Sequence, residues 1–221
     1  MQYARDAHCK VVLPDYHLSP KYPYPAAYED TIAVYRWMQE NARKLQVDSA
    51  RIAIAGDSAG AALAALLCNS CEKRDLIGPC AQMLIYPVTD ASMSTDSMQK
   101  YQDTPLWNAK NNRKMWEFYL NGTKHKPNDD TMRTLENASP MKQILPKNIP
   151  HTYTETAEFD CLHDEGVLYA DKLMAAGVNV ELNETRGTIH GYDSASNARI
   201  VKENVAKRIA FLKSVLKEKS G

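Results

Sequence analysis

The chain has 221 residues, and its 27 Lys and Arg residues are balanced by 27 Asp and Glu, so the formal net charge is zero. A chain of this length commonly folds as one α/β unit, and we expect a single domain over residues 1–221. Without net charge, the protein has no overall field that would draw it to nucleic acid or to an anionic membrane surface. These properties favour a small, uncharged molecule as the partner.

No stretch of the sequence is suited to a membrane anchor or a signal peptide. No apolar run reaches the roughly 18–20 residues that a transmembrane helix needs, and the segment from Met1 to Asp6 lacks the apolar run of a leader. The scattered, odd-numbered cysteines suit free thiols in a reducing compartment; they are Cys9, Cys68, Cys71, Cys80 and Cys161. Cys68 and Cys71 have metal or redox spacing, but no second pair completes a zinc site. We expect a cytoplasmic protein that uses no metal or other cofactor.

Short apolar runs rich in β-branched residues alternate along the chain with longer segments of helical period. This order predicts an α/β fold with a mainly parallel sheet and helices on both faces. The predicted strands are Val11–Leu13, Arg51–Ala55, Gln82–Tyr86, Thr152–Thr156 and Asn179–Asn183. The predicted helices are Pro25–Leu45, Ala59–Lys73, Asp164–Ala176 and Ser194–Lys217.

The stretch from Asp90 to Pro150 interrupts this alternation. It is polar and contains several prolines, and its sequence predicts one helix at Ala109–Tyr119. Connections this long in a compact domain are usually lids, binding loops or disordered segments. We interpret residues 91–150 as a cap-like insertion over the edge of the sheet. Its aromatic residues either line an acyl pocket or pack internally; they are Trp107, Trp116, Phe118 and Tyr119.

The segment from Gly56 to Gly60 has the pattern G-x-S-x-G between a predicted strand and a predicted helix. On so sharp a turn the backbone of Ser58 is strained, and side chains two positions before or after it would collide, which explains both glycines. The turn would expose the Ser58 hydroxyl. It would also place the Ala59 N–H at a helix start, where backbone donors and the helix dipole stabilise an oxyanion. The bare pattern arises by chance in roughly one chain in fifteen of this length, so its context decides.

A serine nucleophile needs a base within hydrogen-bond reach and a carboxylate that orients this base. With such a turn, the chain order is serine, acid, histidine. Asp160 follows the strand predicted at Thr152–Thr156, and His190 lies in a glycine-containing loop after the last predicted strand, so these two are the candidate acid and base. Asp164 and Glu165 are alternative acids, although their place in a first helical turn is typical of caps. The histidines without a comparable loop are His8, His17, His125, His151 and His163.

Together these motifs resemble the hormone-sensitive-lipase-like family of α/β-hydrolase esterases, nearly from end to end. The landmarks are Asp15-Tyr16-His17-Leu18-Ser19-Pro20, Gly56-Asp-Ser-Ala-Gly60, Asn137-Ala-Ser-Pro140, Asp160-Cys-Leu-His-Asp-Glu-Gly166 and His190-Gly-Tyr192. The resemblance implies an α/β-hydrolase fold and a serine carboxylic ester hydrolase for short-chain acyl esters. By that resemblance, Ser58 attacks the ester carbonyl, His190 transfers protons and Asp160 orients His190.

The sequence departs from the family's pattern in two ways. His17 stands where the family usually has arginine, Lys21 where it has an acid and Tyr192 where it often has phenylalanine, but none of these bears directly on the predicted triad. The family's His-Gly-Gly-Gly loop, which forms most of the oxyanion hole, has no counterpart here, which leaves the N–H of Ala59. Each lost donor costs roughly 10²–10³ in rate, so we expect low activity or none.

The missing loop also bears on the sheet, because the family's strand that carries it lies between those equivalent to Val11–Leu13 and Arg51–Ala55. Either Val11–Leu13 shifts to pair directly, or a gap leaves an open edge that is prone to association, as in a homodimer. We interpret the chain as N-terminally truncated. Two functions stay open: the complete triad favours an esterase, and the missing loop favours a non-catalytic α/β-hydrolase-fold protein that binds a small ligand or a partner.

Overall fold

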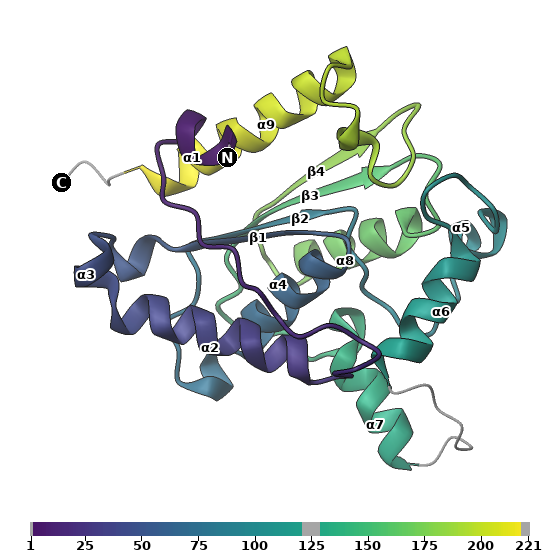
Figure 1. Ribbon diagram of the computed structural model, residues 1–221, viewed down its shortest axis with the longest axis horizontal. Coiled ribbons are helices and arrows are strands. Elements are labelled where there is room, and N and C mark those ends of the chain that lie inside the picture. The colour runs from purple at the N-terminus through teal and green to yellow at the C-terminus, as the bar shows by residue number, and fades with distance from the viewer. Residues whose placement is uncertain (1, 121–128, 218–221) are drawn as a thin grey trace.

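A parallel sheet lies at the centre of the molecule (Figure 1). The computed structural model of the chain describes residues 2–120 and 129–217. Within them the strands are β1 (Ala53–Asp57), β2 (Ala81–Ile85), β3 (His151–Ala157) and β4 (Val180–Thr185). They pair in the order β1-β2-β3-β4, so each strand lies beside the next one in the chain.

β2 and β3 form the buried middle of the sheet. Every residue of β2 is buried, as is β3 from Thr152 onward. Parallel strands covered on both faces have near-continuous apolar sequences, and the run Met83–Ile85 has this character. The register aligns Ile85 with Asp57 of β1 and with Glu155 of β3. The carboxyl ends of these three strands therefore reach one edge of the sheet, where functional groups gather in open α/β sheets.

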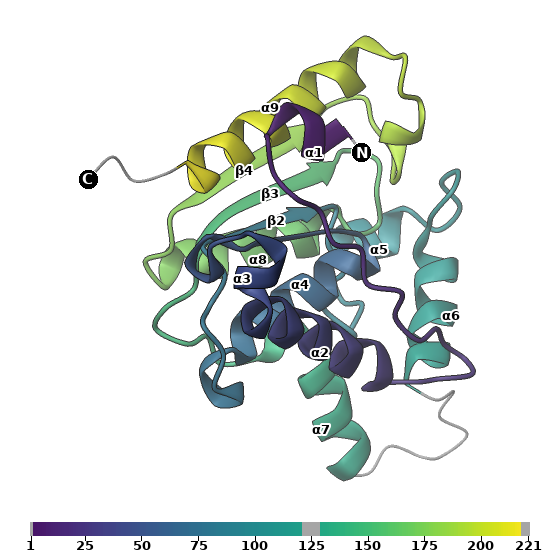
Figure 2. The same ribbon diagram turned by 60° about the vertical axis from the view of Figure 1, so that its left-hand side comes forward.

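Helices cover both faces of the sheet, as the alternation predicts. Their bounds are α1 Gln2–Asp6, α2 Ala26–Glu40, α3 Ala42–Leu45, α4 Ala59–Ser70, α8 His163–Ala175 and α9 Arg199–Leu216. α9 lies on one face with α1 beside it, and α4 and α8 lie on the other (Figures 1 and 2). On the first face Phe211 packs with Tyr153, and on the second Leu84 packs with Tyr169. α2 packs on the outer side of α4.

The insertion after β2 is mainly helical where the structure describes it. It contains α5 (Asp96–Lys100), α6 (Ala109–Tyr119), α7 (Asp129–Ala138) and a 3-10 turn at Pro140–Lys142. α6 has the predicted bounds, and its start is capped by Asn108, whose side chain accepts a hydrogen bond from the Asn111 N–H at 3.0 Å. α5 was not predicted, because five residues are too few to show a helical period. α7 was not predicted although it is amphipathic, because it has few apolar residues. Residues 121–128 lie outside the described residues.

The predicted strand Val11–Leu13 is wrong. This segment has no regular secondary structure, and Val11 and Leu13 are 49% and 86% exposed. It belongs to the stretch between α1 and α2, on the side of the sheet where β1 lies (Figures 1 and 2). In the described part of the chain no strand lies between this segment and β1, and the segment does not itself pair with β1. Of the two expected outcomes, the gap stays open.

Several predicted helices have different ends in the structure. The helix predicted over 25–45 is divided at Asn41, whose N–H donates to the Trp37 carbonyl at 3.0 Å and closes α2. α4 ends at Ser70, and a 3-10 turn at Glu72–Arg74 follows it. The C-terminal helix starts five residues later than predicted, because Tyr192–Ser194 form a separate 3-10 turn. Among the described residues, no helix combines the length and apolar character needed to cross a bilayer.

Candidate active site

Ser58 sits on a strained turn between the end of β1 and the start of α4. Its φ of 55° and ψ of −120° are unfavourable for a residue with a Cβ atom. A Cβ atom on Gly56 would come within 2.2 Å of the Gly60 backbone, so only glycine fits at position 56. A Cβ on Gly60 would meet no described atom within 4 Å. The collision predicted for both glycines therefore holds on one side of Ser58 only.

The three residues predicted as a triad form a continuous hydrogen-bonded series. His190 Nε2 lies 3.0 Å from Ser58 Oγ, and His190 Nδ1 lies 2.6 Å from Asp160 Oδ2. The Leu162 N–H donates to the second Asp160 oxygen, Oδ1, at 3.0 Å. Asp160 is fully buried and His190 is 8% exposed, so little water competes for these bonds. This geometry can pass the serine proton to the imidazole while the carboxylate holds the Nδ1–H tautomer.

Loops at the carboxyl ends of β3 and β4 bring the acid and the histidine to Ser58. Asp160 lies between β3 and α8, where its carbonyl accepts a hydrogen bond from the His163 N–H at 3.1 Å. His190 lies in the loop after β4, and Gly191 beside it has a φ of 68°, which a residue with a Cβ atom adopts at a cost. Three distant parts of the chain thus meet at one edge of the sheet.

The alternative acids bind elsewhere. Asp164 Oδ2 accepts a hydrogen bond from the Ser97 N–H at 2.7 Å, and Glu165 Oε1 accepts one from the Thr89 N–H at 2.6 Å. The two carboxylates thus lie in the first turn of α8, as predicted, but they hold the insertion against α8. Burial raises the pKa of Glu165 to about 8. Asp160 is the carboxylate bonded to the imidazole of His190.

Among the other described histidines, His8 is exposed and three have carboxylate partners. Those with carboxylate partners are His17 with Asp30, His151 with Glu181, and His163 with Asp164 and Glu184. His125 lies outside the described residues. His190 is the histidine whose ring reaches the Ser58 hydroxyl.

A largely apolar cavity of about 380 Å³ opens beside Ala59, the first residue of α4. The N–H groups in the first turn of a helix have no partners inside the helix. The Ala59 N–H is therefore available to a ligand in this cavity. α4 contributes Ala62 to the wall, and α6 contributes Met115 and Phe118. All four aromatic residues singled out in the insertion line this cavity. Trp116 also belongs to a buried core cluster, so it lines the cavity and packs internally at once.

Sequence reasoning missed Tyr86, whose ring lies against the imidazole of His190 with a centroid distance of 4.5 Å. The Trp107 ring lies near the same imidazole, with a centroid distance of 5.8 Å. Tyr86 directly follows β2 and has a φ of 35°, a conformation that is rare for a bulky residue. Its place at the carboxyl end of a central parallel strand is the signal that could have identified it.

Comparison with known proteins places this site in a family. Residues 1–194 match the family described as the alpha/beta hydrolase fold. The chain belongs to this family. Its resemblance to hormone-sensitive-lipase-like esterases and the predicted fold class are thereby confirmed.

The relatives of this α/β hydrolase include named esterases. It is 38% identical over 192 residues to carboxylesterase NlhH of Mycobacterium tuberculosis, a match that covers 86% of this chain and 58% of that protein. It is 36% identical over 190 residues to ethyl acetate hydrolase of Pseudomonas putida, with the same coverage. The crystal structure of esterase LipW from Mycobacterium marinum has a TM-score of 0.88 and 33% identity, and covers 98% of this chain and 66% of that one. The α/β hydrolase thus spans about 58% of the length of these curated relatives.

Proposed function

We propose that this chain is a serine carboxylic ester hydrolase that acts on short-chain acyl esters, with Ser58, His190 and Asp160 as its catalytic triad. The observation that carries the proposal is the series of bonds from Ser58 Oγ through His190 to Asp160, at 3.0 and 2.6 Å. The names of the relatives, carboxylesterase and ethyl acetate hydrolase, support the reaction class.

The geometry fits an acyl-enzyme mechanism. Ser58 Oγ attacks the ester carbonyl carbon while His190 Nε2 takes the hydroxyl proton, and Asp160 stabilises the imidazolium that forms. The Ala59 N–H donates to the oxyanion of the tetrahedral intermediate. His190 then gives its proton to the departing alcohol. A water molecule attacks the acyl-serine in the same way, which releases the acid and restores the hydroxyl.

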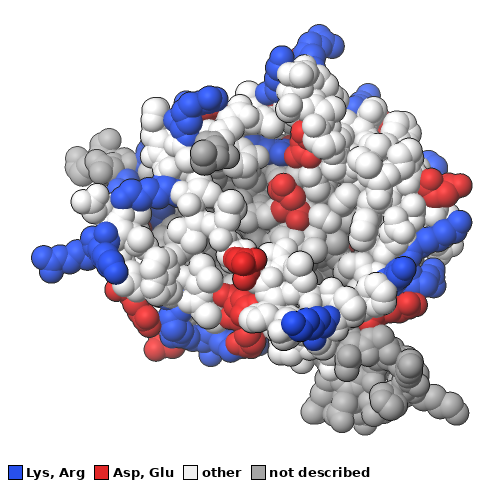
Figure 3. All heavy atoms as spheres, viewed as in Figure 1, with Lys and Arg blue, Asp and Glu red and all other residues white. Residues whose placement is uncertain are grey.

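We place the acyl group in the cavity beside Ala59. Its volume of about 380 Å³ and apolar walls suit a short hydrocarbon chain. Residues 91–150, which supply α6 to this wall, act as its cap within a single domain. On the face shown in Figure 3, acidic and basic side chains are interspersed. Such a surface favours an uncharged small-molecule ester over a polyanionic partner.

We also propose that two copies associate through the free edge of β1. Among the described residues, β1 pairs with β2 on one side only, and Ala55 and Asp57 are exposed. A groove of about 640 Å³ at the end of β1 is lined by both acidic and basic side chains, including Asp57, Lys202 and Lys213. Backbone groups on a sheet edge pair readily with another chain, and the mixed charges allow a second copy to be complementary.

The thiols support a location in the cytoplasm. All five cysteines are free, and Cys68, Cys71 and Cys161 are buried. Free thiols persist in a reducing compartment. Alkylation of denatured protein isolated without reductant should label all five, and protection of any pair as a disulfide would contradict this location.

The first experiment is hydrolysis of p-nitrophenyl esters, from acetate to octanoate, together with labelling by a fluorophosphonate probe. We expect slow turnover and labelling in the wild type and neither in Ser58→Ala, because the nucleophile is lost. Labelling needs an activated serine, so it reports on Ser58 even where the oxyanion hole is weak. Equal traces in wild type and Ser58→Ala would support the non-catalytic alternative.

A matched pair of variants tests the acid. Asp160→Asn should lower kcat by about 10³–10⁴-fold, because the imidazole loses the carboxylate that fixes its tautomer. Asp164→Asn, four residues later, should leave kcat within about threefold, because Asp164 binds Ser97 instead. Equal losses in the two variants would refute the role of Asp160.

A further inference from the structure

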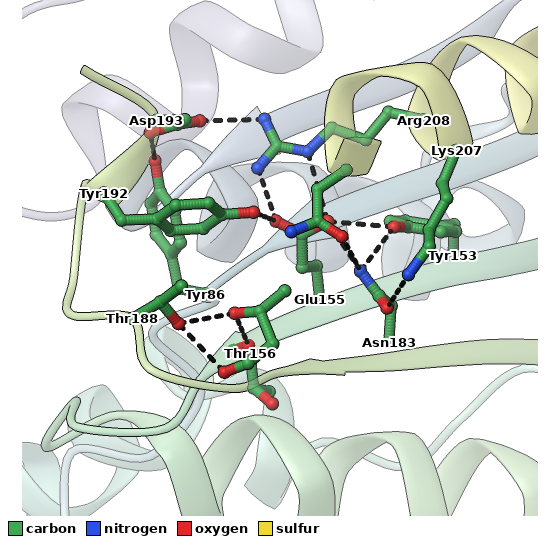
Figure 4. Close-up of polar contacts among 12 residues, drawn as sticks. Tyr86, Tyr153, Glu155, Thr156, Asn183, Thr188, Tyr192, Asp193, Lys207 and Arg208 are labelled. Carbon is green, nitrogen blue, oxygen red and sulfur yellow. Dashed lines mark hydrogen bonds and ion pairs between the residues drawn. The ribbon is translucent and has the colours of Figure 1, made fainter. Parts of the chain in front are cut away.

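A buried ion pair lies behind the loop that carries His190 (Figure 4). Arg208 of α9 and Glu155 of β3 are 2% and 0% exposed. Arg208 donates to both carboxylate oxygens of Glu155, from Nη2 to Oε1 and from Nε to Oε2, the second bond being 3.3 Å long. An ion pair removed from water is retained at a cost unless its remaining donors and acceptors are also bonded. Where those further bonds lead therefore indicates what the pair holds in place.

Two of those further bonds lead to the His190 loop. The Tyr192 hydroxyl donates to Glu155 Oε1 at 2.8 Å, and Arg208 Nη1 donates to Asp193 Oδ2 at 2.8 Å. Tyr192 and Asp193 are the second and third residues after His190. Adjacent residues of the loop are thus bonded to opposite members of the ion pair.

A hydrogen bond and a ring contact, both made by Tyr86, connect this network to the imidazole. The Tyr86 hydroxyl donates to Asp193 Oδ1 at 2.8 Å, and the Tyr86 ring lies on the His190 ring. The Tyr86 N–H donates to the Glu155 carbonyl at 2.6 Å, so the backbone that carries this ring is fixed to β3. Tyr86 therefore lies against the imidazole, while hydrogen bonds hold both its backbone and its hydroxyl.

The other end of the loop is attached separately. Thr185 Oγ1 donates to the Thr156 carbonyl at 2.7 Å, and the hydroxyls of Thr185 and Thr188 lie 2.6 Å apart. The Phe159 N–H donates to the Thr188 carbonyl at 2.9 Å. The residues before His190 are thus held by β3 and its following turn, and those after it by the ion pair.

We infer that the Glu155–Arg208 pair, acting through Tyr192, Asp193 and Tyr86, positions the imidazole of His190 between Asp160 and Ser58. Tyr192, Asp193 and Tyr86 are positioning residues. Through Arg208, α9 takes part in holding the loop that carries His190. The inference rests on the proposed esterase function. Its physical basis is that proton transfer needs heavy-atom separations near 3 Å, and a misplacement of about 1 Å costs roughly 10²-fold in rate.

The chain offers a matched pair of variants for testing this inference. Tyr192→Phe removes a hydrogen bond of 2.8 Å to Glu155, and Tyr153→Phe removes one of 2.9 Å to the same carboxylate. The Tyr153 hydroxyl also accepts a hydrogen bond from Asn183 Nδ2 at 3.1 Å, and in Tyr153→Phe this donor keeps its bond to Glu155 Oε2. Both tyrosines are at least 90% buried and both changes delete one hydroxyl. Tyr192 lies in the His190 loop, whereas Tyr153 lies in β3 on the far side of the carboxylate. Tyr86→Phe is a third variant, which keeps the ring on His190 and removes the bond to Asp193.

Three measurements distinguish positioning from general stability: kcat and KM for p-nitrophenyl acetate, the NMR resonance of the His190 Nδ1–H, and thermal unfolding. We expect Tyr192→Phe and Tyr86→Phe to lower kcat about 3–10-fold with KM within about twofold, and to shift or broaden the resonance. Tyr153→Phe should lose similar stability but keep kcat within about twofold and the wild-type resonance.

Equal changes in Tyr192→Phe and Tyr153→Phe, or unchanged kcat and resonance in both Tyr192→Phe and Tyr86→Phe, would overturn the inference. The resonance separates this failure from failure of the proposed function. If the wild type does not hydrolyse esters, the proposed function fails. The positioning network is still supported in that case if Tyr192→Phe and Tyr86→Phe perturb the Nδ1–H resonance and Tyr153→Phe does not. If the wild type is active and its resonance is equally insensitive to all three variants, the network fails and the esterase stands.

Discussion

At the scale of single residues, Glu165 carries the clearest pH dependence. It is fully buried, and among the described residues its Oε2 atom has no hydrogen-bond partner. Burial raises its pKa from 4.5 to about 8, against the opposing hydrogen bonds from the N–H groups of Thr89 and Asp90. Because the folded-state pKa is the higher one, the stabilisation linked to the proton is complete below about pH 4.5 and is lost as the pH rises through about 8.

Glu165→Gln should therefore flatten the pH dependence of stability. The amide stays neutral at every pH and keeps an oxygen that can accept from the Thr89 N–H. We expect the free energy of unfolding at pH 8 to exceed that of the wild type by about 1–3 kcal/mol, and the difference to shrink towards pH 5. Urea unfolding at a series of pH values measures the difference in free energy of unfolding and its change with pH.

Asp164→Asn is the control, because the pKa of Asp164 is shifted in the other direction. Burial opposes the shift, but hydrogen bonds from His163 and from Ser97 lower this pKa. The stability that Asp164 contributes is present above its unfolded-state pKa and is lost as the pH falls. The variant should keep the wild-type slope between about pH 5 and 8. A flattened slope there in Asp164→Asn, or an unchanged one in Glu165→Gln, would contradict this account.

At the scale of elements, α4 and α6 both contribute to the wall of the cavity beside Ala59. Ala62 of α4 and Phe118 of α6 both line it. Ala62→Leu should narrow the cavity and lower kcat/KM for the octanoate ester about tenfold or more relative to acetate. Phe118→Ala should widen it and shift the preference towards longer chains, because burial of each added methylene contributes about 0.8 kcal/mol of binding free energy. If both variants shift the acyl-chain preference in the same direction, the acyl chain does not bind in this cavity.

An element could be predicted where its own residues determine it, and could not where it depends on residues far away in the chain. α6 carries its own cap and apolar period, so a local reading of the sequence was sufficient for its bounds. A strand depends on a neighbour that can be far away in the chain, and Val11–Leu13 has the composition of a strand but lies outside the sheet. Ser58, Asp160 and His190 were predicted because a motif and a chain order identify them. Arg208 and Glu155 are 53 residues apart, and no local pattern connects them.

At the scale of the whole molecule, the proposed contact between two copies is the edge of β1 that has no neighbouring strand among the described residues. Parallel sheets are normally covered, and an exposed edge invites pairing unless a charge or a bulge blocks it. If two copies meet there, Ala55→Lys places a desolvated charge in the interface and should shift the population to monomer at micromolar concentration, as measured by size-exclusion chromatography with light scattering. Ala176→Lys makes the same change at the exposed end of α8, and should leave the dimer intact. A monomeric wild type, or equal dissociation in both variants, would show that β1 is not the contact.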